Sequence, residues 1–279
     1  MRSETLIVGI IGGTGKMGSF FRGVFERAGH EVRVSGRKTV LTNARLAEEC
    51  DIVIVSVPIR ATVPVIEEIA PLLREDQLLC DLTSLKVNPV RAMCKSRAQV
   101  IGLHPMFGPS ASSLKNQTVI VTPVRVRDAT LSGILHILKS EGAVLTITTP
   151  EAHDRMMATV QGLNHFMILT MAETLRREGV SLHDSLEFMS PIYRMQVGLV
   201  GRILGQDPDL YGDILQLNPY VPEVLEACEA SVHTLRGIVE TGDREKFRAR
   251  FQENAAHFGE YLAQAAKETD ALIECMVRQ

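Results

Sequence analysis

Short runs of aliphatic and β-branched residues alternate with amphipathic segments over roughly the first 150 residues. Continuous apolar runs, rather than alternating ones, are typical of strands buried on both faces of a parallel sheet. The pattern predicts strands at Leu6–Ile11, Glu31–Ser35, Asp51–Val57, Gln77–Leu82, Gln99–Leu103, Thr118–Thr122 and Ala143–Thr148. It predicts helices between them at Gly18–Ala28, Ala61–Leu73, Pro89–Ser96 and Asp128–Glu141. This order indicates an α/β fold with a mostly parallel, doubly wound sheet.

The pattern of hydrophobic and polar residues changes near Pro150. Strand-like runs disappear after it, and long helical patterns rich in Ala, Leu, Met and Glu continue to the C-terminus. Prolines 191, 208, 219 and 222 mark helix starts or breaks within them. We therefore predict two domains, an α/β domain at 1–150 and an all-helical domain at 151–279.

A glycine motif follows the first predicted strand and opens the next helix. Its residues are Gly13, Thr14, Gly15, Lys16, Met17 and Gly18. We expect Gly13 to permit a tight turn, Gly15 to let a pyrophosphate approach, and Gly18 to allow close helix packing. The helix N-terminus would present N–H groups to the phosphates. Alone, such a motif fits a plain glycine turn equally well, but the alternating domain around it favours a Rossmann-type dinucleotide site.

The residues at the tip of the second strand bear on the choice of cofactor. An acidic residue there binds the ribose 2′-hydroxyl of NAD, whereas this chain has Ser35, Gly36, Arg37 and Lys38. Arg37 could hold a 2′-phosphate through bidentate bonds, with Ser35 and Lys38 as further donors. A solvated basic loop is the alternative. The tip favours NADP over NAD.

Two polar groups follow neighbouring strands at the edge where such sheets bind ligands. Ser84 and Lys86 come after the strand at 77–82, and His104 comes after the strand at 99–103. A histidine has a pKa suited to a general base for alcohol oxidation. Ser84 could hold His104 and a substrate hydroxyl together. Taken alone, the alternative of a loop histidine bonded to the backbone is the stronger interpretation.

Composition excludes several classes of function. The chain has 279 residues, 45% hydrophobic and 23% charged, with a net charge of −3, so neither nucleic acid nor a membrane is an expected partner. No apolar run is long enough to span a bilayer, and no secretion signal is evident. The five cysteines are scattered without metal-ligand spacing. We expect a cytoplasmic protein without a metal.

Six motifs occur in a characteristic order. They are Gly13–Gly18, Asp81-x-x-Ser84-x-Lys86, Leu103–Pro109, Glu151–Asp154, Gln161–Phe166, and Ser190–Arg194 leading into Gly201–Pro208. Nearly end to end, this arrangement resembles the prephenate dehydrogenase family. The resemblance implies NAD(P)-dependent oxidative decarboxylation of prephenate to 4-hydroxyphenylpyruvate, in tyrosine biosynthesis. It implies that His104 bonds the ring hydroxyl and drives hydride transfer with support from Ser84. It also implies that His165 and Arg202 bind substrate, and that the helical domain forms a homodimer.

The helical domain offers groups for the two carboxylates of prephenate. Arg194 and Arg202 lie eight residues apart, about 80° around a helix, so one face can present both. Gln161 and His165 are also spaced to share a face. Each arginine could instead be a surface residue, and Arg194 could be structural. The pair at 153–154 could equally be a helix cap, an interdomain contact or a site element.

The motifs leave other functions open. An arogenate or 4-amino-4-deoxyprephenate dehydrogenase would differ only in polar contacts around the ring and side chain of the substrate. A deazaflavin-dependent NADP reductase shares the glycine loop but does not explain the His104 motif. A non-catalytic NADP-sensing protein would not need Ser84, His104 and Arg202 together. No chorismate mutase or regulatory segment is recognised, so we expect a single-activity form. Apolar stripes in the C-terminal half favour a symmetric dimer.

Overall fold

The computed structural model describes residues 5–278. The chain divides into two compact units, each with its own internal contacts. The first unit holds the residues up to Ala158 together with Gly212–Pro219. The second holds Thr159–Tyr211 and the chain from Tyr220 onward. No described helix is both long and apolar enough to cross a membrane.

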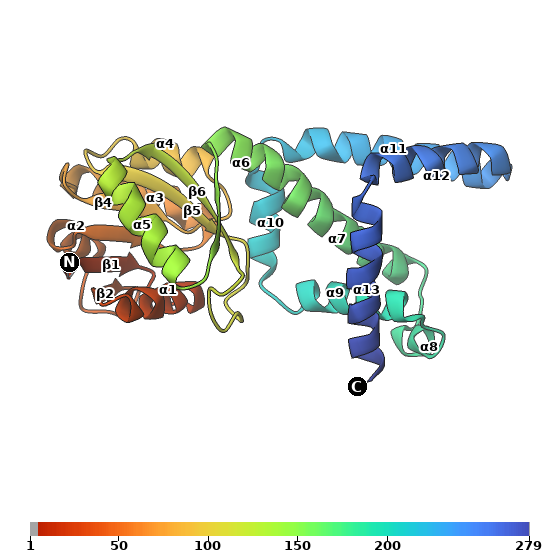
Figure 1. Ribbon diagram of the computed structural model, residues 1–279, viewed down its shortest axis with the longest axis horizontal. Coiled ribbons are helices and arrows are strands. Elements are labelled where there is room, and N and C mark those ends of the chain that lie inside the picture. Colours follow the sequence, from red (N-terminus) through yellow and green to blue (C-terminus); the bar gives the residue numbers. More distant parts are fainter. Residues whose placement is uncertain (1–4, 279) are drawn as a thin grey trace. The chain divides into compact units, whose positions relative to one another are not determined.

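The first unit is built on a seven-stranded sheet (Figure 1). Its strands are β1 (Ile7–Ile11), β2 (Glu31–Ser35), β3 (Ile52–Val55), β4 (Leu78–Asp81), β5 (Gln99–Pro105), β6 (Thr118–Arg125) and β7 (Val144–Ile147). They lie in the order β2-β1-β3-β4-β5-β6-β7, and all neighbouring pairs are parallel except β5 with β6. The predicted doubly wound sheet is confirmed.

Helices cover both faces of this sheet. They are α1 (Lys16–Arg27), α2 (Asn43–Glu49), α3 (Ile59–Ile69) with the short η1 (Ala70–Leu72), α4 (Val87–Met93), α5 (Asp128–Ser140) and α6 (Pro150–Met157). On one face, α1 and α5 bury side chains such as Phe21 and Leu138 against the strands. On the other face, α2, α3 and α4 do the same with residues such as Leu46, Ile66 and Met93. Burial on both faces explains why the strands are continuous apolar runs in the sequence.

The second unit is helical. A π-helical turn, η2 (Ala158–Leu163), continues α6 into α7 (Asn164–Arg177). The later helices are α8 (Leu182–Glu187), α9 (Pro191–Leu204), α10 (Pro208–Leu217), α11 (Val221–Thr241), α12 (Arg244–Phe258) and α13 (Tyr261–Val277). Within this unit, α7 and α13 each pack on α9, and α11 packs on α12. The predicted all-helical C-terminal region is confirmed.

Segment 212–219 returns to the first unit, so α10 starts in one unit and ends in the other. Asn218 donates a 2.7 Å hydrogen bond to the carbonyl of Asp154. Arg60 on α3 forms a 2.6 Å ion pair with Asp213. The sequence pattern placed a single boundary near Pro150, where Thr149 caps α6 and Pro150 occupies its first turn. The compact units divide later, after Ala158, and twice more around this returning segment.

Candidate active site

The glycine motif forms the turn between β1 and α1. Gly12 has a φ of +81°, and a Cβ there would lie 2.2 Å from the Ser56 carbonyl oxygen. The left-handed residue of the turn is therefore Gly12, which precedes the motif. A Cβ on Gly13 would instead meet the Val34 side chain at 2.5 Å, and one on Gly18 would meet the Gly12 carbonyl oxygen at 2.5 Å. These contacts bring α1 close to the end of β1.

The N-terminus of α1 is suited to a phosphate group. Its N-cap residue is Gly15, which has no side chain to accept a bond from the first turn, and that turn has no acidic residue. Thr14, Gly15 and Lys16 are exposed, and Met17 is half-buried. The first N–H groups of a helix lack internal acceptors and carry a partial positive charge. The turn can therefore hold the pyrophosphate of a dinucleotide.

The tip of β2 is organised differently from the sequence-based expectation. Ser35 is buried, and its hydroxyl donates to Asn43 Oδ1 at 2.8 Å. Its carbonyl accepts from the N–H groups of Gly12 and Gly13. The sequence suggested Ser35 as a cofactor donor, but its hydroxyl is engaged within the protein and its carbonyl anchors the glycine turn. Arg37 and Lys38 remain exposed on this loop.

His104 lies within a strand and is buried. The parallel pairing of β5 with β4 ends at Gly102, but antiparallel pairing with β6 continues to Pro105 and places His104 opposite Ile120. The side chain is only 2% exposed. Burial, together with the fields of His153 and Lys86, holds the pKa of His104 well below its ordinary value. The predictions that His104 follows the strand in an exit loop, and that its pKa is not strongly perturbed, were therefore wrong.

A chain of buried side chains runs back from His104. Its Nδ1 lies 2.8 Å from Nε2 of His153, and Nδ1 of His153 lies 2.7 Å from Oδ1 of Asp154. The exposed fractions of these three residues are at most 2%. His153 and Asp154 are both on α6, a helix that packs on α4 and β6. The sequence left this pair open between a cap, an interdomain contact and a site element, and the geometry joins it directly to His104.

Asp154 also fixes the start of α4. Its Oδ1 accepts from the N–H of Lys86 at 2.8 Å, and its Oδ2 accepts from the N–H of Val87 at 2.9 Å. Ser84 is half-buried in the loop just before this helix. Because β4 and β5 are parallel neighbours, Ser84, just beyond the end of β4, and His104, near the end of β5, lie at the same sheet edge as the glycine turn.

A fully buried ion pair lies beneath this edge. The Lys86 ammonium pairs with Asp81 and donates to the carbonyl of Leu103 at 2.7 Å. Burial lowers the pKa of Lys86, and the neighbouring Asp81 carboxylate opposes that shift. Leu103, which accepts this bond, immediately precedes His104 in the chain. Lys86 therefore holds the strand that carries the imidazole, a role that its spacing in the motif did not indicate.

In the second unit, two of the predicted substrate-binding residues are joined by a residue that the motifs did not single out. His165 opens α7 and packs edge-to-face on Tyr211, with ring centroids 5.0 Å apart. Burial raises the pKa of Tyr211, and the field of the Arg202 guanidinium opposes that shift. His165, Tyr211 and Arg202 therefore form one cluster. Burial lowers the pKa of His165, and its Nδ1 is buried without a hydrogen-bond partner in the described structure.

Gln161 lies one turn before His165. It is on η2, and its Oε1 is buried. Wide π-helical turns are costly and occur often at functional sites, so this one is consistent with a binding role. Nothing in the amino-acid pattern distinguishes a π-turn from ordinary helix.

Arg194 has a contact of its own. It lies on α9 with Arg202, but its Nη1 donates a long 3.4 Å bond to the carbonyl of Met276 near the end of α13. It also lines a small hollow with Pro191 and Val277. These contacts support the structural alternative for Arg194.

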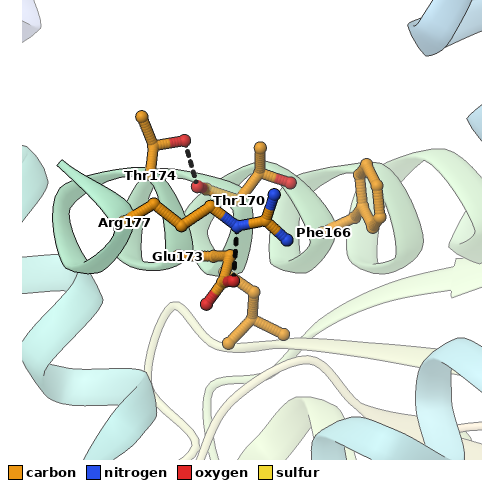
Figure 2. A pocket seen from close by; sticks show the side chains of 6 residues that line it. Phe166, Thr170, Glu173, Thr174 and Arg177 are labelled. Atoms are coloured by element: carbon orange, nitrogen blue, oxygen red, sulfur yellow. Dashed lines mark hydrogen bonds and ion pairs between the residues drawn. The ribbon is translucent and has the colours of Figure 1, made fainter.

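An open groove follows α7 beyond His165 (Figure 2). Phe166, Thr170 and Arg177 line it, and Arg177 pairs with Glu173 at 2.7 Å. The described part of α7 has no buried residue, and neither do the described parts of α12 and α13. Of the apolar stripe expected to pair between copies, Val200 and Ile203 are buried within the chain, whereas Leu204 is 61% exposed.

Comparison with known families shows which family these motifs belong to. Residues 27–147 match the family described as prephenate dehydrogenase, nucleotide-binding domain, and residues 149–253 match prephenate dehydrogenase, dimerization domain. The chain belongs to the prephenate dehydrogenase family. The family match begins after the glycine turn and includes Ser84, His104, His153 and Arg202. It divides close to Pro150.

Individual members of the family are similar over nearly the whole chain. A probable arogenate/prephenate dehydrogenase of Methanocaldococcus jannaschii is 38% identical over 98% of this chain and 66% of its own length. The T-protein of Haemophilus influenzae is 32% identical over 95% of this chain and 70% of its own. A 4-amino-4-deoxyprephenate dehydrogenase of Streptomyces pristinaespiralis is 26% identical, covering 91% and 92%. The chain thus spans about two thirds of the length of the first two relatives.

Solved structures of the family share the fold. Synechocystis arogenate dehydrogenase superposes with a TM-score of 0.73 at 18% identity, covering 92% of this chain and 100% of that one. A prephenate dehydrogenase from A. aeolicus, in complex with hydroxyphenyl propionate and NAD+, superposes with a TM-score of 0.75 at 21% identity, covering 94% and 100%. The architecture of both units is therefore that of the prephenate dehydrogenase family.

Proposed function

We propose that this protein is an NADP-dependent prephenate dehydrogenase, which oxidises and decarboxylates prephenate to 4-hydroxyphenylpyruvate on the route to tyrosine. The observation that carries the proposal is the buried imidazole of His104, at the sheet edge that also bears the dinucleotide turn and backed by His153 and Asp154. Such a base has no use in a protein that only senses a dinucleotide.

The N-terminal unit fits a nicotinamide dinucleotide. A Cβ on Gly18 would be blocked by the turn backbone, and the start of α1 is uncapped and exposed. Thr14, Lys16 and Met17 would lie along the phosphates. The choice of NADP rests on Arg37 and Lys38, which are exposed at the β2 tip with no carboxylate in residues 36–43. When bound, the nicotinamide ring supplies the acceptor for the hydride.

The substrate has two carboxylates, and the helical unit supplies cationic and polar groups for them. We assign one carboxylate to Arg202 and further polar contacts to His165 and Gln161. Arg194 is left out of this set because it bonds α13. The proposal requires that His104 and Arg202 bind the same substrate molecule.

The chain's own part in the reaction is to move one proton and to orient the ring. The imidazole of His104 accepts the proton of the C4 hydroxyl while the hydride leaves C4, with Ser84 holding that hydroxyl in place. The bond to the ring carboxylate then breaks, CO₂ departs, and the ring becomes aromatic. Aromatisation makes the overall reaction effectively irreversible, so the protein needs to supply mainly orientation and electrostatics.

The test is to incubate the purified protein with NADP or NAD and with prephenate or arogenate, following reduced cofactor and aromatic product together. We expect the highest kcat/KM with prephenate and NADP. His104→Asn should lower kcat by about 10²–10⁴-fold with little change in KM, the usual contribution of a general base. Absence of cofactor reduction with every pair would refute the function. A His104→Asn variant with near-normal kcat would refute the proposed role of His104 but not the proposed function of the protein.

Arogenate is the second candidate substrate. The M. jannaschii relative bears both substrates in its name, and arogenate differs from prephenate only in the side chain. An arogenate dehydrogenase would use His104 and Arg202 in the same way. The same assay separates the two by the ratio of kcat/KM for the two substrates.

We also propose that the protein works as a homodimer joined through the helical unit. Its match is to a dimerization domain, and the large hydrophobic side chains buried among its described residues are only Val200, Ile203 and Val221. A unit that buries so few large hydrophobic side chains leaves others exposed, and exposed apolar patches mark interaction surfaces. A second copy of the chain is the occupant that this family match favours.

A further inference from the structure

The two histidines and the aspartate behind the catalytic position form a chain in which each bond has one possible direction. Asp154 accepts backbone N–H bonds on both oxygens, from Lys86 on Oδ1 and from Val87 on Oδ2. A backbone N–H can only donate, so these oxygens act as acceptors. Nδ1 of His153, 2.7 Å from Oδ1, must then carry the proton.

The same reasoning passes to His104. A neutral imidazole carries a proton on one nitrogen and a lone pair on the other. With its proton on Nδ1, His153 presents the lone pair of Nε2 to Nδ1 of His104 at 2.8 Å. Nδ1 of His104 must therefore donate, and the lone pair of that ring lies on Nε2.

The charges around this chain favour two neutral rings. Burial lowers the pKa of both histidines, and the Lys86 ammonium lowers both further. Asp154 works in the opposite direction on His153. Asp81 faces Lys86 and is paired with it. The bond directions derived above require each ring to carry a single proton. This is the neutral form that the lowered pKa values of both histidines favour near neutral pH.

We propose that His153 and Asp154 are positioning residues that hold His104 as the Nδ1–H tautomer, so that Nε2 is the atom that accepts the substrate proton. This inference rests on the proposed function for its catalytic consequence, but the tautomer itself does not depend on any substrate. It also explains why α6, rather than the sheet alone, supplies part of the site.

The proton balance of the step follows. The substrate O–H bond breaks and an N–H bond forms on Nε2, which makes His104 an imidazolium. Its Nδ1–H stays bonded to His153, whose Nδ1–H stays bonded to the Asp154 carboxylate. No proton passes to Asp154, whose negative charge stabilises the new positive charge through His153. Loss of CO₂ leaves a phenolate oxygen, and the proton on Nε2 returns to it, so the product leaves as a phenol and His104 is neutral again.

Two substitutions of His153 separate positioning from packing. In His153→Gln, the amide reaches the place of Nε2, so its oxygen can still accept from Nδ1 of His104. His153→Phe keeps a buried ring and removes that acceptor. Asp154 is unsuitable for this test because its substitution would also release α4. We expect kcat to fall about 10²–10³-fold in His153→Phe, by analogy with other bases held in the wrong tautomer, and within about tenfold in His153→Gln.

The direct readout is nitrogen-15 NMR of histidine-labelled protein without substrate. The chain has eight histidines, and the His104 signals are those missing from His104→Asn. We expect the proton on Nδ1 in the wild type and in His153→Gln, and a mixture of tautomers in His153→Phe. A wild-type proton on Nε2, or a His153→Phe enzyme with kcat within about twofold of normal, would overturn the inference. If no substrate is turned over but the proton is on Nδ1, the function fails and the tautomer assignment stands.

Discussion

A buried imidazole is a different base from an exposed one. His104 is surrounded by β-sheet, by His153 and by the Lys86 ammonium, all of which disfavour its charged form. The neutral form, which can accept a proton, is therefore the resting state at neutral pH. The imidazolium that forms during the proposed reaction then needs a negative charge to stabilise it. The carboxylate of Asp154, which is linked to Nδ1 of His104 through His153, can provide this charge.

The pH dependence of the rate should report this environment. The pKa of His104 is lowered, so the neutral, active form persists as pH falls through about 6.5, where an ordinary histidine is half protonated. The acidic limb of kcat/KM, which reports the free enzyme, should therefore have its midpoint below pH 6.5. Initial rates at several pH values and saturating cofactor measure it. A midpoint at or above 6.5 would mean that the environment of His104 in solution is not the buried one.

The two arginines of α9 should behave differently. Arg202→Ala removes the proposed partner of a substrate carboxylate, so KM should rise at least about tenfold, equivalent to roughly 1.4 kcal/mol, with a smaller change in kcat. Arg194→Ala is the matched control, because it makes the same change on the same helix at a residue bonded to Met276. Its KM should stay near normal. If both substitutions raised KM equally, Arg194 would also be a substrate-binding residue, as the sequence suggested.

At the scale of elements, α1 packs closely against the turn after β1. Gly18 faces the backbone of Gly12 and Gly13, and a Cβ added to it would lie 2.5 Å from a carbonyl oxygen and 2.7 Å from a Cα atom. Backbone atoms cannot move aside as a flexible side chain can. The spacing of the motif therefore reflects contact distances as well as the needs of a ligand.

Gly18→Ala should therefore destabilise the fold by about 1–3 kcal/mol, the usual cost of overpacking, and should weaken cofactor binding by displacing the turn. Gly23→Ala on the same helix is the control, since its new methyl would meet only the tip of Arg27, at 3.1 Å. That substitution should be neutral or stabilising, by up to about 1 kcal/mol. Denaturant unfolding and cofactor titration measure both effects. Equal stabilities of the two variants would contradict the contact at Gly18.

The elements could be predicted where one physical signal determined them. The central strands β3, β4 and β5 were found because burial on both faces leaves mostly apolar runs. The short helix α2 was missed because Leu46 is its one large apolar residue, so its sequence shows no apolar period. The burial of His104 was missed because it depends on antiparallel pairing with β6, a tertiary contact absent from the local pattern. Likewise, spacing grouped His165 with Gln161, whereas the fold groups it with Tyr211.

At the scale of the molecule, the helical unit has too little core of its own. Phe247 and Phe251 on α12 stack 6.4 Å apart, yet they are 49% and 65% exposed. Residues of this kind are usually covered in the working assembly. Since the family match names dimerization, we expect such pairs to contribute to the contact between copies.

Phe251→Asp should therefore weaken the dimer at least about 100-fold, because burying a phenyl ring contributes roughly 1.5–3 kcal/mol and an interface aspartate adds a desolvation cost. Gln252→Asp adds the same charge to the neighbouring position of α12 and should leave the dimer intact. Sedimentation or light scattering over a range of concentrations measures the change. A wild-type monomer at high concentration would contradict the homodimer, and an unaffected Phe251→Asp dimer would move the interface elsewhere.

The return of segment 212–219 to the first unit has a consequence for recombination between relatives. A chimera made by exchanging everything after Pro150 would place a foreign His153 and Asp154 behind the parent's His104. It would also bring in a foreign stretch of chain where Asp213 pairs with the parent's Arg60. Substrate preference can be transplanted cleanly only with three crossover points, so that residues 212–219 travel with the dinucleotide half rather than with the helices that flank them.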